Sequence, residues 1–140
     1  MGDKANIVTD TSAVLAVCLR EATRQQVIAR TKGVELLAPR SLPLEIPNAL
    51  SSKFKQDQLT LGEARAALER FGKIPIQLVE VDLKEATRLA HELDTYAYDA
   101  YMIDAARRHG VPILSLDGGL CEAAGRAGVE TIKIAHEDTP

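Results

Sequence analysis

Four acidic residues stand at or near the ends of apolar segments of this chain, where carboxylates could carry out chemistry. They are Asp10, Glu45, Asp99 and Asp117. A carboxylate placed beside Leu, Ile and Val is costly unless another group compensates its charge. If the fold gathers the four, their mutual repulsion raises their pKa values unless a divalent cation neutralises them. We therefore expect a carboxylate pocket that holds Mg²⁺ or Mn²⁺, hard cations that take oxygen ligands.

The segments that must position these acids alternate between strand-like and helix-like patterns. The expected strands cover 7–9, 35–38, 76–81, 112–116 and 129–134. The expected helices follow caps at Ser12, Ser41 and Asp82, and cover 21–32, 61–71, 99–109 and 120–127. This alternation predicts an α/β fold with a parallel sheet and helices on both faces. Ligands of such sheets bind at the carboxyl ends of the strands, where Asp10 and Asp117 are expected to lie.

Length and composition predict one ordinary globular domain that spans residues 1–140. The net charge of −3 provides no basic field, but this is weak grounds against nucleic acid, because four clustered carboxylates exceed the whole imbalance. No apolar run approaches the roughly 20 residues that span a bilayer, and the first residues lack the apolar region of a signal peptide. We expect a cytoplasmic protein that does not bind a membrane.

Four short motifs surround the acids. They are Asp10-Thr11-Ser12 after the first strand, Glu45-Ile46-Pro47-Asn48 within a helix, Tyr98-Asp99-Ala100-Tyr101 at the opening of a later helix, and Ser115-Leu116-Asp117 after a strand. In this order and spacing they resemble the motifs of PIN domains, and most of all the VapC-type toxins of toxin–antitoxin pairs. The resemblance implies a compact fold with a central parallel sheet of about five strands. It also implies an endoribonuclease that depends on Mg²⁺ or Mn²⁺.

The same resemblance assigns roles to individual residues. It implies that Asp10, Glu45, Asp99 and Asp117 hold the metal and form the catalytic centre. It implies that Ser12 and Ser115 orient carboxylates or waters, and that Asn48 supports the site from the helix of Glu45. The implied partners are an RNA substrate, a small antitoxin whose tail blocks the pocket with an Arg or Lys, and a second copy of the chain in a homodimer.

Two residues depart from the family pattern. Pro47 stands where such proteins commonly have Ala, and we expect it to kink its helix and to affect the placement of Glu45. Asp104 interrupts an apolar run, about 140° round the helix from Asp99. We expect Asp104 to be solvated or salt-bridged, with a role near the metal as the alternative.

Other readings of the acids remain open at this point. Taken singly, each acid could be a helix cap, a turn residue or a surface charge. A PIN-like domain could also serve as an inactive scaffold or binding module. An Asp-based phosphatase or a receiver domain is a third class, but the phosphatase needs a second Asp where Ser12 stands. The sequence does not identify the RNA or the number of metals.

Overall fold

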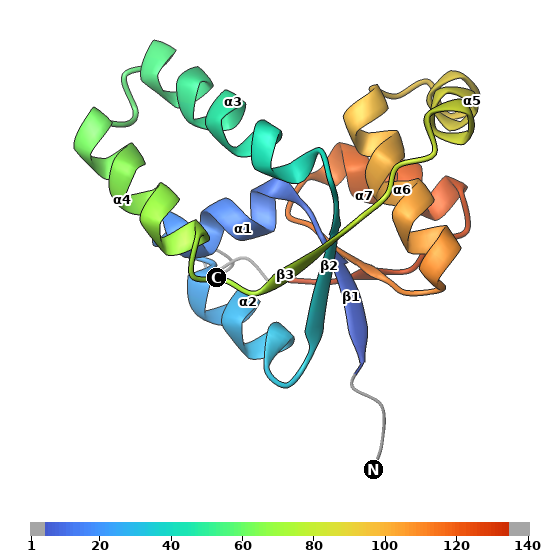
Figure 1. The fold of residues 1–140 in the computed structure, drawn as a ribbon, viewed down its shortest axis with the longest axis horizontal. Coiled ribbons are helices and arrows are strands. Elements are labelled where there is room, and N and C mark those ends of the chain that lie inside the picture. The colour runs from blue at the N-terminus through green and yellow to red at the C-terminus, as the bar shows by residue number, and fades with distance from the viewer. Residues whose placement is uncertain (1–4, 135–140) are drawn as a thin grey trace, which may run out of the picture.

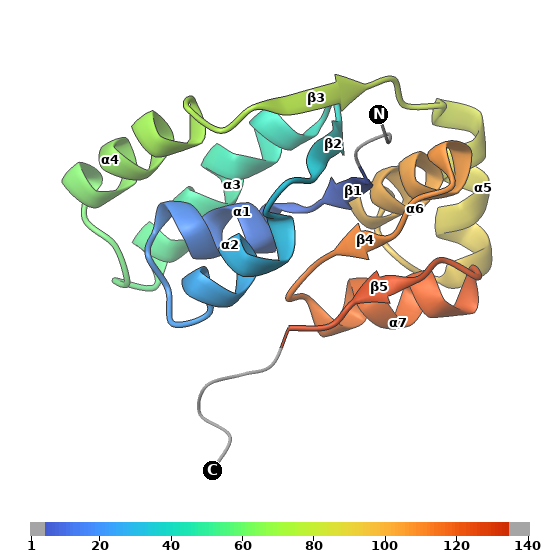
Figure 2. The same cartoon turned by 90° about the horizontal axis from the view of Figure 1, so that it is seen from below.

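The computed structural model describes residues 5–134 and contains one sheet of five parallel strands (Figures 1 and 2). The strands are β1 (Asn6–Thr9), β2 (Glu35–Pro39), β3 (Ile76–Val79), β4 (Ile113–Leu114) and β5 (Thr131–Ile132), in the order β3-β2-β1-β4-β5. The helices are α1 (Thr11–Cys18), α2 (Arg24–Thr31), α3 (Leu42–Lys55), α4 (Leu61–Phe71), α5 (Leu83–Leu93), α6 (Ala97–His109) and α7 (Gly118–Arg126). The predicted α/β fold with a five-stranded parallel sheet is confirmed.

Both faces of the sheet are covered because successive strand residues point to opposite sides. Ile7 and Leu114 pack in a small apolar cluster with α1 and α2. Their neighbours Val8 and Ile113 pack in the larger cluster with α3, α5, α6 and α7. Strands buried on both faces are uniformly apolar, as the sequence of β4 indicated.

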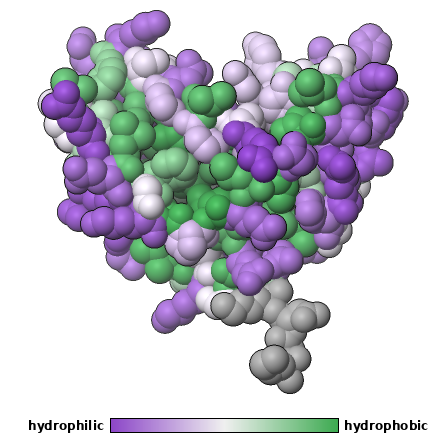
Figure 3. All heavy atoms as spheres, viewed as in Figure 1, coloured by the Kyte–Doolittle hydropathy of each residue, from purple (hydrophilic) through white to green (hydrophobic). Residues whose placement is uncertain are grey.

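The strand order places β1 beside β4, and the direction of the connections reverses between these two strands. Such a switch point opens a crevice at the carboxyl ends of the strands. Figure 1 shows α3 and α4 on one side of this crevice and α5 and α6 on the other. Apolar side chains gather in the hollow between the two arms, and hydrophilic ones cover the outer flanks (Figure 3). The fold thus leaves one recess next to the ends of β1 and β4.

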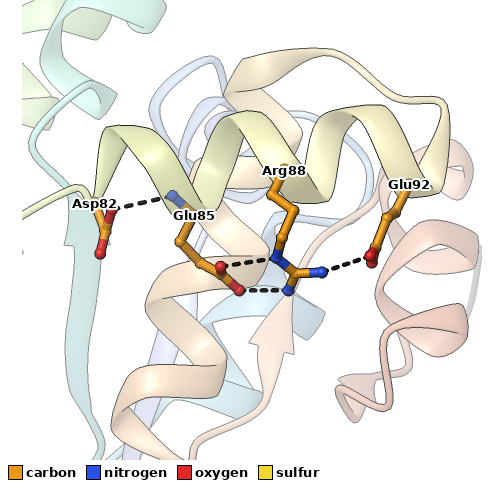
Figure 4. Close-up of polar contacts among 4 residues, drawn as sticks. All are labelled: Asp82, Glu85, Arg88 and Glu92. Carbon is orange, nitrogen blue, oxygen red and sulfur yellow. Dashed lines mark hydrogen bonds and ion pairs between the residues drawn. The ribbon is translucent and has the colours of Figure 1, made fainter.

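Helix α5 stabilises the arm that carries α6. Oδ1 of Asp82 accepts a hydrogen bond from the backbone N–H of Glu85 at 3.0 Å, which confirms the predicted cap. The guanidinium of Arg88 then pairs with Glu85 and with Glu92, each at 2.6 Å, along the exposed face of the helix (Figure 4). Pairs at these spacings add a few tenths of a kcal/mol each. The opposite face of α5 packs on α6.

Several helix ends differ from the prediction. Asp10, not Ser12, is the N-cap of α1. Residue Glu21 donates its N–H to the carbonyl of Ala16 at 2.8 Å, so it closes the end of α1 and the next helix begins only at Arg24. Similarly, α6 begins at Ala97, two residues before Asp99, and α7 begins at Gly118 directly after its cap, Asp117.

Strands β3, β4 and β5 are shorter than predicted. Strand β3 ends at Val79, β4 contains only Ile113 and Leu114, and β5 contains only Thr131 and Ile132. In β4 the preceding Pro112 has no N–H to donate to a ladder, and Ser115 turns its hydroxyl toward other partners described below. None of the helices within residues 5–134 has the length and apolar character that a membrane crossing requires.

Candidate active site

Asp10 lies where β1 ends, and its carboxylate is held on several sides. Asp10 caps α1, and its Oδ1 accepts a hydrogen bond from the N–H of Ala13 at 3.0 Å. The hydroxyl of Ser12 lies 2.8 and 2.9 Å from the two carboxylate oxygens, and the hydroxyl of Ser115 donates to Oδ2 at 2.5 Å. The residue is only 5% exposed. Asp10 is therefore fixed in one orientation at the floor of the recess.

The two serines also tie the end of β1 to the end of β4. The Oγ of Ser12 accepts the N–H of Leu116 at 2.8 Å, and the Oγ of Ser115 accepts the N–H of Asp117 at 2.9 Å. Each hydroxyl oxygen thus accepts a backbone N–H from the segment after β4, and each hydroxyl donates its own proton to the carboxylate of Asp10. This arrangement leaves little freedom in the relative position of Asp10 and the segment that carries Asp117.

Burial dominates the acidity of Asp10. Loss of water around the carboxylate raises its pKa from 3.8 to about 6. The hydrogen bonds from Ser115, from the N–H of Ala13 and from Ser12 lower the pKa, and the charge of Asp117 raises it further. A carboxylate that holds its proton up to about this pH is unusual and is typical of a functional site.

Glu45 projects into the same recess from the first turn of α3. Its Oε2 accepts a hydrogen bond from Ser41 at 2.6 Å, and its Oε1 accepts one from Thr11 at 3.2 Å. Burial raises the pKa of Glu45, the two hydroxyls lower it, and the charge of Asp99 raises it again. Ser41 is therefore not only the residue before α3; its side chain positions the acid.

Asp99 lies in the first turn of α6, and the Thr95 hydroxyl donates to its Oδ2 at 3.1 Å. Burial raises the pKa of Asp99, the bond from Thr95 lowers it, and the charge of Asp117 raises it. Asp117 caps α7, where its Oδ1 accepts the N–H groups of Gly119 and Leu120 at 2.9 and 3.2 Å. Oδ1 of Asp117 accepts both of these hydrogen bonds, and Oδ2 takes no part in capping the helix.

All four acids line one cavity of about 360 Å³ at the carboxyl ends of the strands. The other lining residues are Thr11, Ser12, Leu15, Glu21, Ala49, Lys53, Met102, Leu116 and Leu120. Ser115 does not line the cavity itself, but its hydroxyl holds Asp10, which does. Asn48 does not line the cavity, and its side chain is exposed on α3. The structure thus brings together six of the seven residues that the sequence singled out.

The donor chemistry of the cavity fits a hard divalent cation. Three pairs of carboxylates, Asp10 with Asp117, Glu45 with Asp99, and Asp99 with Asp117, are close enough for one charge to raise the pKa of the other. A bound cation removes this repulsion. Within residues 5–134, no three His, Cys, Asp or Glu side chains already form a cage. Mg²⁺ does not require one, because it keeps several waters and takes only one or two carboxylates directly.

Pro47 does not remove Glu45 from the site. Helix α3 continues through Pro47 to Lys55, and the proline is exposed. Its missing N–H leaves the carbonyl of Pro43 without the usual helical donor. Glu45 still reaches the cavity and is held by Ser41 and Thr11.

Asp104 was expected to be solvated or salt-bridged; it is buried, so the solvated alternative is wrong, and it pairs with Arg108, so the salt-bridged alternative is confirmed. It is 2% exposed, because α6 packs between the sheet and α5 and has no free side at this position. Burial raises its pKa, while the nearby Arg108 and the N–H of Asp82 lower it. Its Oδ2 lies 3.6 Å from Nη1 of Arg108 and has no hydrogen bond, which makes the predicted salt bridge a loose one. Asp104 does not line the acidic cavity.

Sequence reasoning missed the hydroxyls that hold the acids. Ser41 and Thr95 each stand four residues before the acid they contact, Glu45 and Asp99. A hydroxyl residue one helical turn before an acid at a helix start was the available signal. Thr11 follows Asp10 directly and carried no such periodic signal.

The comparison with known proteins agrees with this geometry. The family model described as PIN domain matches residues 7–126. No curated protein matches the sequence.

Three solved structures share the fold at low sequence identity. PAE2754 from Pyrobaculum aerophilum is 20% identical, with a TM-score of 0.65 over 86% of this chain and 87% of that one. VapC20 from Mycobacterium tuberculosis, described as a sarcin–ricin loop cleaving toxin, is 17% identical, with a TM-score of 0.64 over 91% and 98% of the two chains. FitAcB from Neisseria gonorrhoeae is 17% identical, with a TM-score of 0.60 over 91% and 96%.

Proposed function

Since this chain belongs to the PIN domain family, we propose that it is an endoribonuclease that cleaves RNA phosphodiester bonds in its acidic cavity with the help of Mg²⁺ or Mn²⁺. One observation carries the proposal. Four carboxylates from four separate elements line a single cavity at the switch point of the sheet, and the fold maintains them there although burial and mutual repulsion raise the pKa values of three of them.

Asp10, Glu45, Asp99 and Asp117 would hold the cation. When bound, it supplies an acidified water as nucleophile and offsets the charge that builds on the phosphate. The protein contributes the positions of the carboxylates: Asp10 is fixed by Ser12 and Ser115. Glu45 is held by Ser41 and Thr11, and Asp99 by Thr95.

We further propose that the chain acts as the toxin of a toxin–antitoxin pair. The shared fold with VapC20, described as a sarcin–ricin loop cleaving toxin, supports this proposal. A small antitoxin would insert an Arg or Lys into the acidic cavity, where the excess of carboxylates favours a cation. A homodimer in the cytoplasm is the expected assembly of the toxin.

Cleavage of a labelled RNA in Mg²⁺ or Mn²⁺ tests the enzymatic proposal. We expect wild-type protein to cleave and Asp99→Asn to lose cleavage while it keeps its fold by circular dichroism. Asp57→Asn is the matched control, because it makes the same chemical change at an exposed residue outside the cavity. Growth arrest on expression that disappears in Asp99→Asn would support the toxin role. Cleavage retained by Asp99→Asn would contradict the proposal.

The second candidate function is a PIN-like scaffold without activity. Its support is Pro47, the departure from the family pattern inside the helix that carries Glu45. This scaffold would fold normally, bind no Mn²⁺ and cleave no RNA, whereas the nuclease binds the ion through the same four acids.

A further inference from the structure

A second cavity adjoins the acidic one. It has a volume of about 480 Å³ and lies between the end of α1, the end of α3 and one side of α4. Glu21 and Lys53 line both cavities. An extended strand bound in the acidic cavity could therefore continue directly into this second one, which we call the flanking cavity.

Three cations line the flanking cavity: Arg20, Lys53 and Arg70. Nη1 of Arg70 donates to the carbonyl of Cys18 at 2.6 Å, which fixes the guanidinium against the end of α1 and leaves its other N–H groups available. The ammonium of Lys53 lies 3.8 Å from Oε2 of Glu21, beyond the length of a charge-assisted hydrogen bond. Neither cation is thus fully engaged within the protein.

The backbone of Arg20 is an independent sign that its side chain is needed here. Arg20 follows the C-cap of α1 and has a φ of 58°, in the left-handed region that favours glycine or asparagine at this position. Within the described part of the chain, the other two non-glycine residues with positive φ are Asp57 and Asp94, and Asp tolerates this conformation. Arg has no such tolerance for a positive φ, and strained backbone of this kind concentrates at functional sites.

Two acids, Glu21 and Glu63, also line the flanking cavity, so its three cations leave an excess of one positive charge. Oε1 of Glu63 accepts the N–H of Thr60 at 2.9 Å in the capping box of α4. Glu21 faces Lys53. The apolar side chains of Leu19 and Leu59 complete the walls. Cations with free donors beside apolar walls suit a backbone phosphate with its sugar or base, and arginine is well shaped for phosphate oxygens.

We propose that the flanking cavity binds a backbone phosphate of the RNA strand next to the scissile bond, through Arg20, Lys53 and Arg70. The inference rests on the proposed ribonuclease function. It gives these residues a positioning role: they hold the strand so that its neighbouring phosphate enters the acidic cavity, and they contribute affinity that does not depend on base sequence.

The test is a binding measurement that cleavage cannot disturb. Fluorescence anisotropy of a fluorescein-labelled single-stranded RNA is recorded with Asp99→Asn protein in EDTA at several salt concentrations. In that background we compare Arg20→Gly, Arg20→Lys, Lys53→Gln and the control Arg65→Gln, an exposed cation on α4 outside the cavity. We expect Arg20→Gly and Lys53→Gln to weaken binding about three- to tenfold and to reduce the salt slope by about 0.7 each. Arg20→Lys and Arg65→Gln should bind as the background does.

Arg20→Gly separates this role from a structural one. Glycine relieves the left-handed backbone, so the melting temperature should stay the same or rise while RNA affinity falls. This inference would be overturned if Arg20→Gly and Lys53→Gln bound RNA as tightly as the Asp99→Asn background does. The proposed function would still stand in that case, provided that the wild-type protein binds and cleaves RNA. Absence of RNA binding and cleavage in the wild type would overturn both. Binding of a labelled oligoglutamate peptide that needs Arg20 and Lys53, without an effect of either on RNA, would reassign the cavity to a protein partner.

Discussion

The hydroxyl of Ser115 donates a 2.5 Å hydrogen bond to Oδ2 of Asp10, across 105 positions of sequence. The bond joins the end of β4 to the end of β1, the two strands on either side of the switch point. Ser12, which follows β1, makes a second link between the two strand ends, because its hydroxyl oxygen accepts the N–H of Leu116 after β4. The floor of the candidate active site is therefore a preorganised unit, and a buried carboxylate is its centre.

Burial of Asp10 predicts a specific dependence of stability on pH when no metal is present. A folded-state pKa of about 6 against an ordinary 3.8 means that the folded protein binds the proton more tightly than the unfolded chain. This contribution to stability is complete below about pH 4 and is lost as pH rises through 6, in total about 3 kcal/mol. Urea unfolding in EDTA should show this loss between pH 4 and 7 in the wild type.

Asp10→Asn is the matched variant for that measurement, since it cannot titrate. The difference in the free energy of unfolding between Asp10→Asn and wild type should grow by about 3 kcal/mol from pH 4 to 7 in favour of the variant. Parallel pH profiles for the two proteins would show that Asp10 titrates at its ordinary pKa, and would contradict the described burial.

Removal of the Ser41 hydroxyl should change the pH dependence of cleavage. Ser41 donates to Glu45 and lowers its pKa, so we expect Ser41→Ala to raise that pKa. Cleavage should fall several-fold at pH 6 and recover in part at pH 8. Ser51→Ala removes a hydroxyl from the exposed side of the same helix and should leave the profile unchanged. Equal effects of the two variants would argue against a role for Ser41.

Asp104 should prove structural. Its Oδ2 is buried without a hydrogen bond, and Arg108, its ion-pair partner, is half exposed. Asp104→Asn removes a poorly compensated charge, so we expect the free energy of unfolding at pH 7 to stay the same or to rise by about 1 kcal/mol, with cleavage unaffected. Thermal melting and the RNA assay measure both. A selective loss of cleavage in a well-folded variant would instead support the alternative role near the metal.

The sequence predicted the fold and the main acids for one physical reason. Carboxyl ends of parallel strands meet at the same edge, so an acid that follows β1 and one that follows β4 must lie close together once the strands pair. Asp10 and Asp117 follow this rule. Glu45 and Asp99 lie in the first turns of α3 and α6, and these helices begin near the same edge of the sheet.

The remaining features depend on packing that no local pattern records. The position of Asp104 on α6 suggested a solvated side, but α5 covers that side in the fold. The approach of Lys53 to Glu21 joins the end of α3 to the turn after α1, segments whose relation is set only when the arms pack. The left-handed backbone of Arg20 likewise arises from the way in which α1 ends.

The central claim is that the four carboxylates form one metal site, and calorimetric titration with Mn²⁺ tests it most directly. Wild type, Asp10→Asn and Asp99→Asn are compared at pH 7, with Asp57→Asn as the control and folding verified by circular dichroism. We predict saturable binding in the wild type and in Asp57→Asn, and its loss in both site variants. Well-folded wild type that binds no Mn²⁺, or site variants that bind it as the wild type does, would contradict the account.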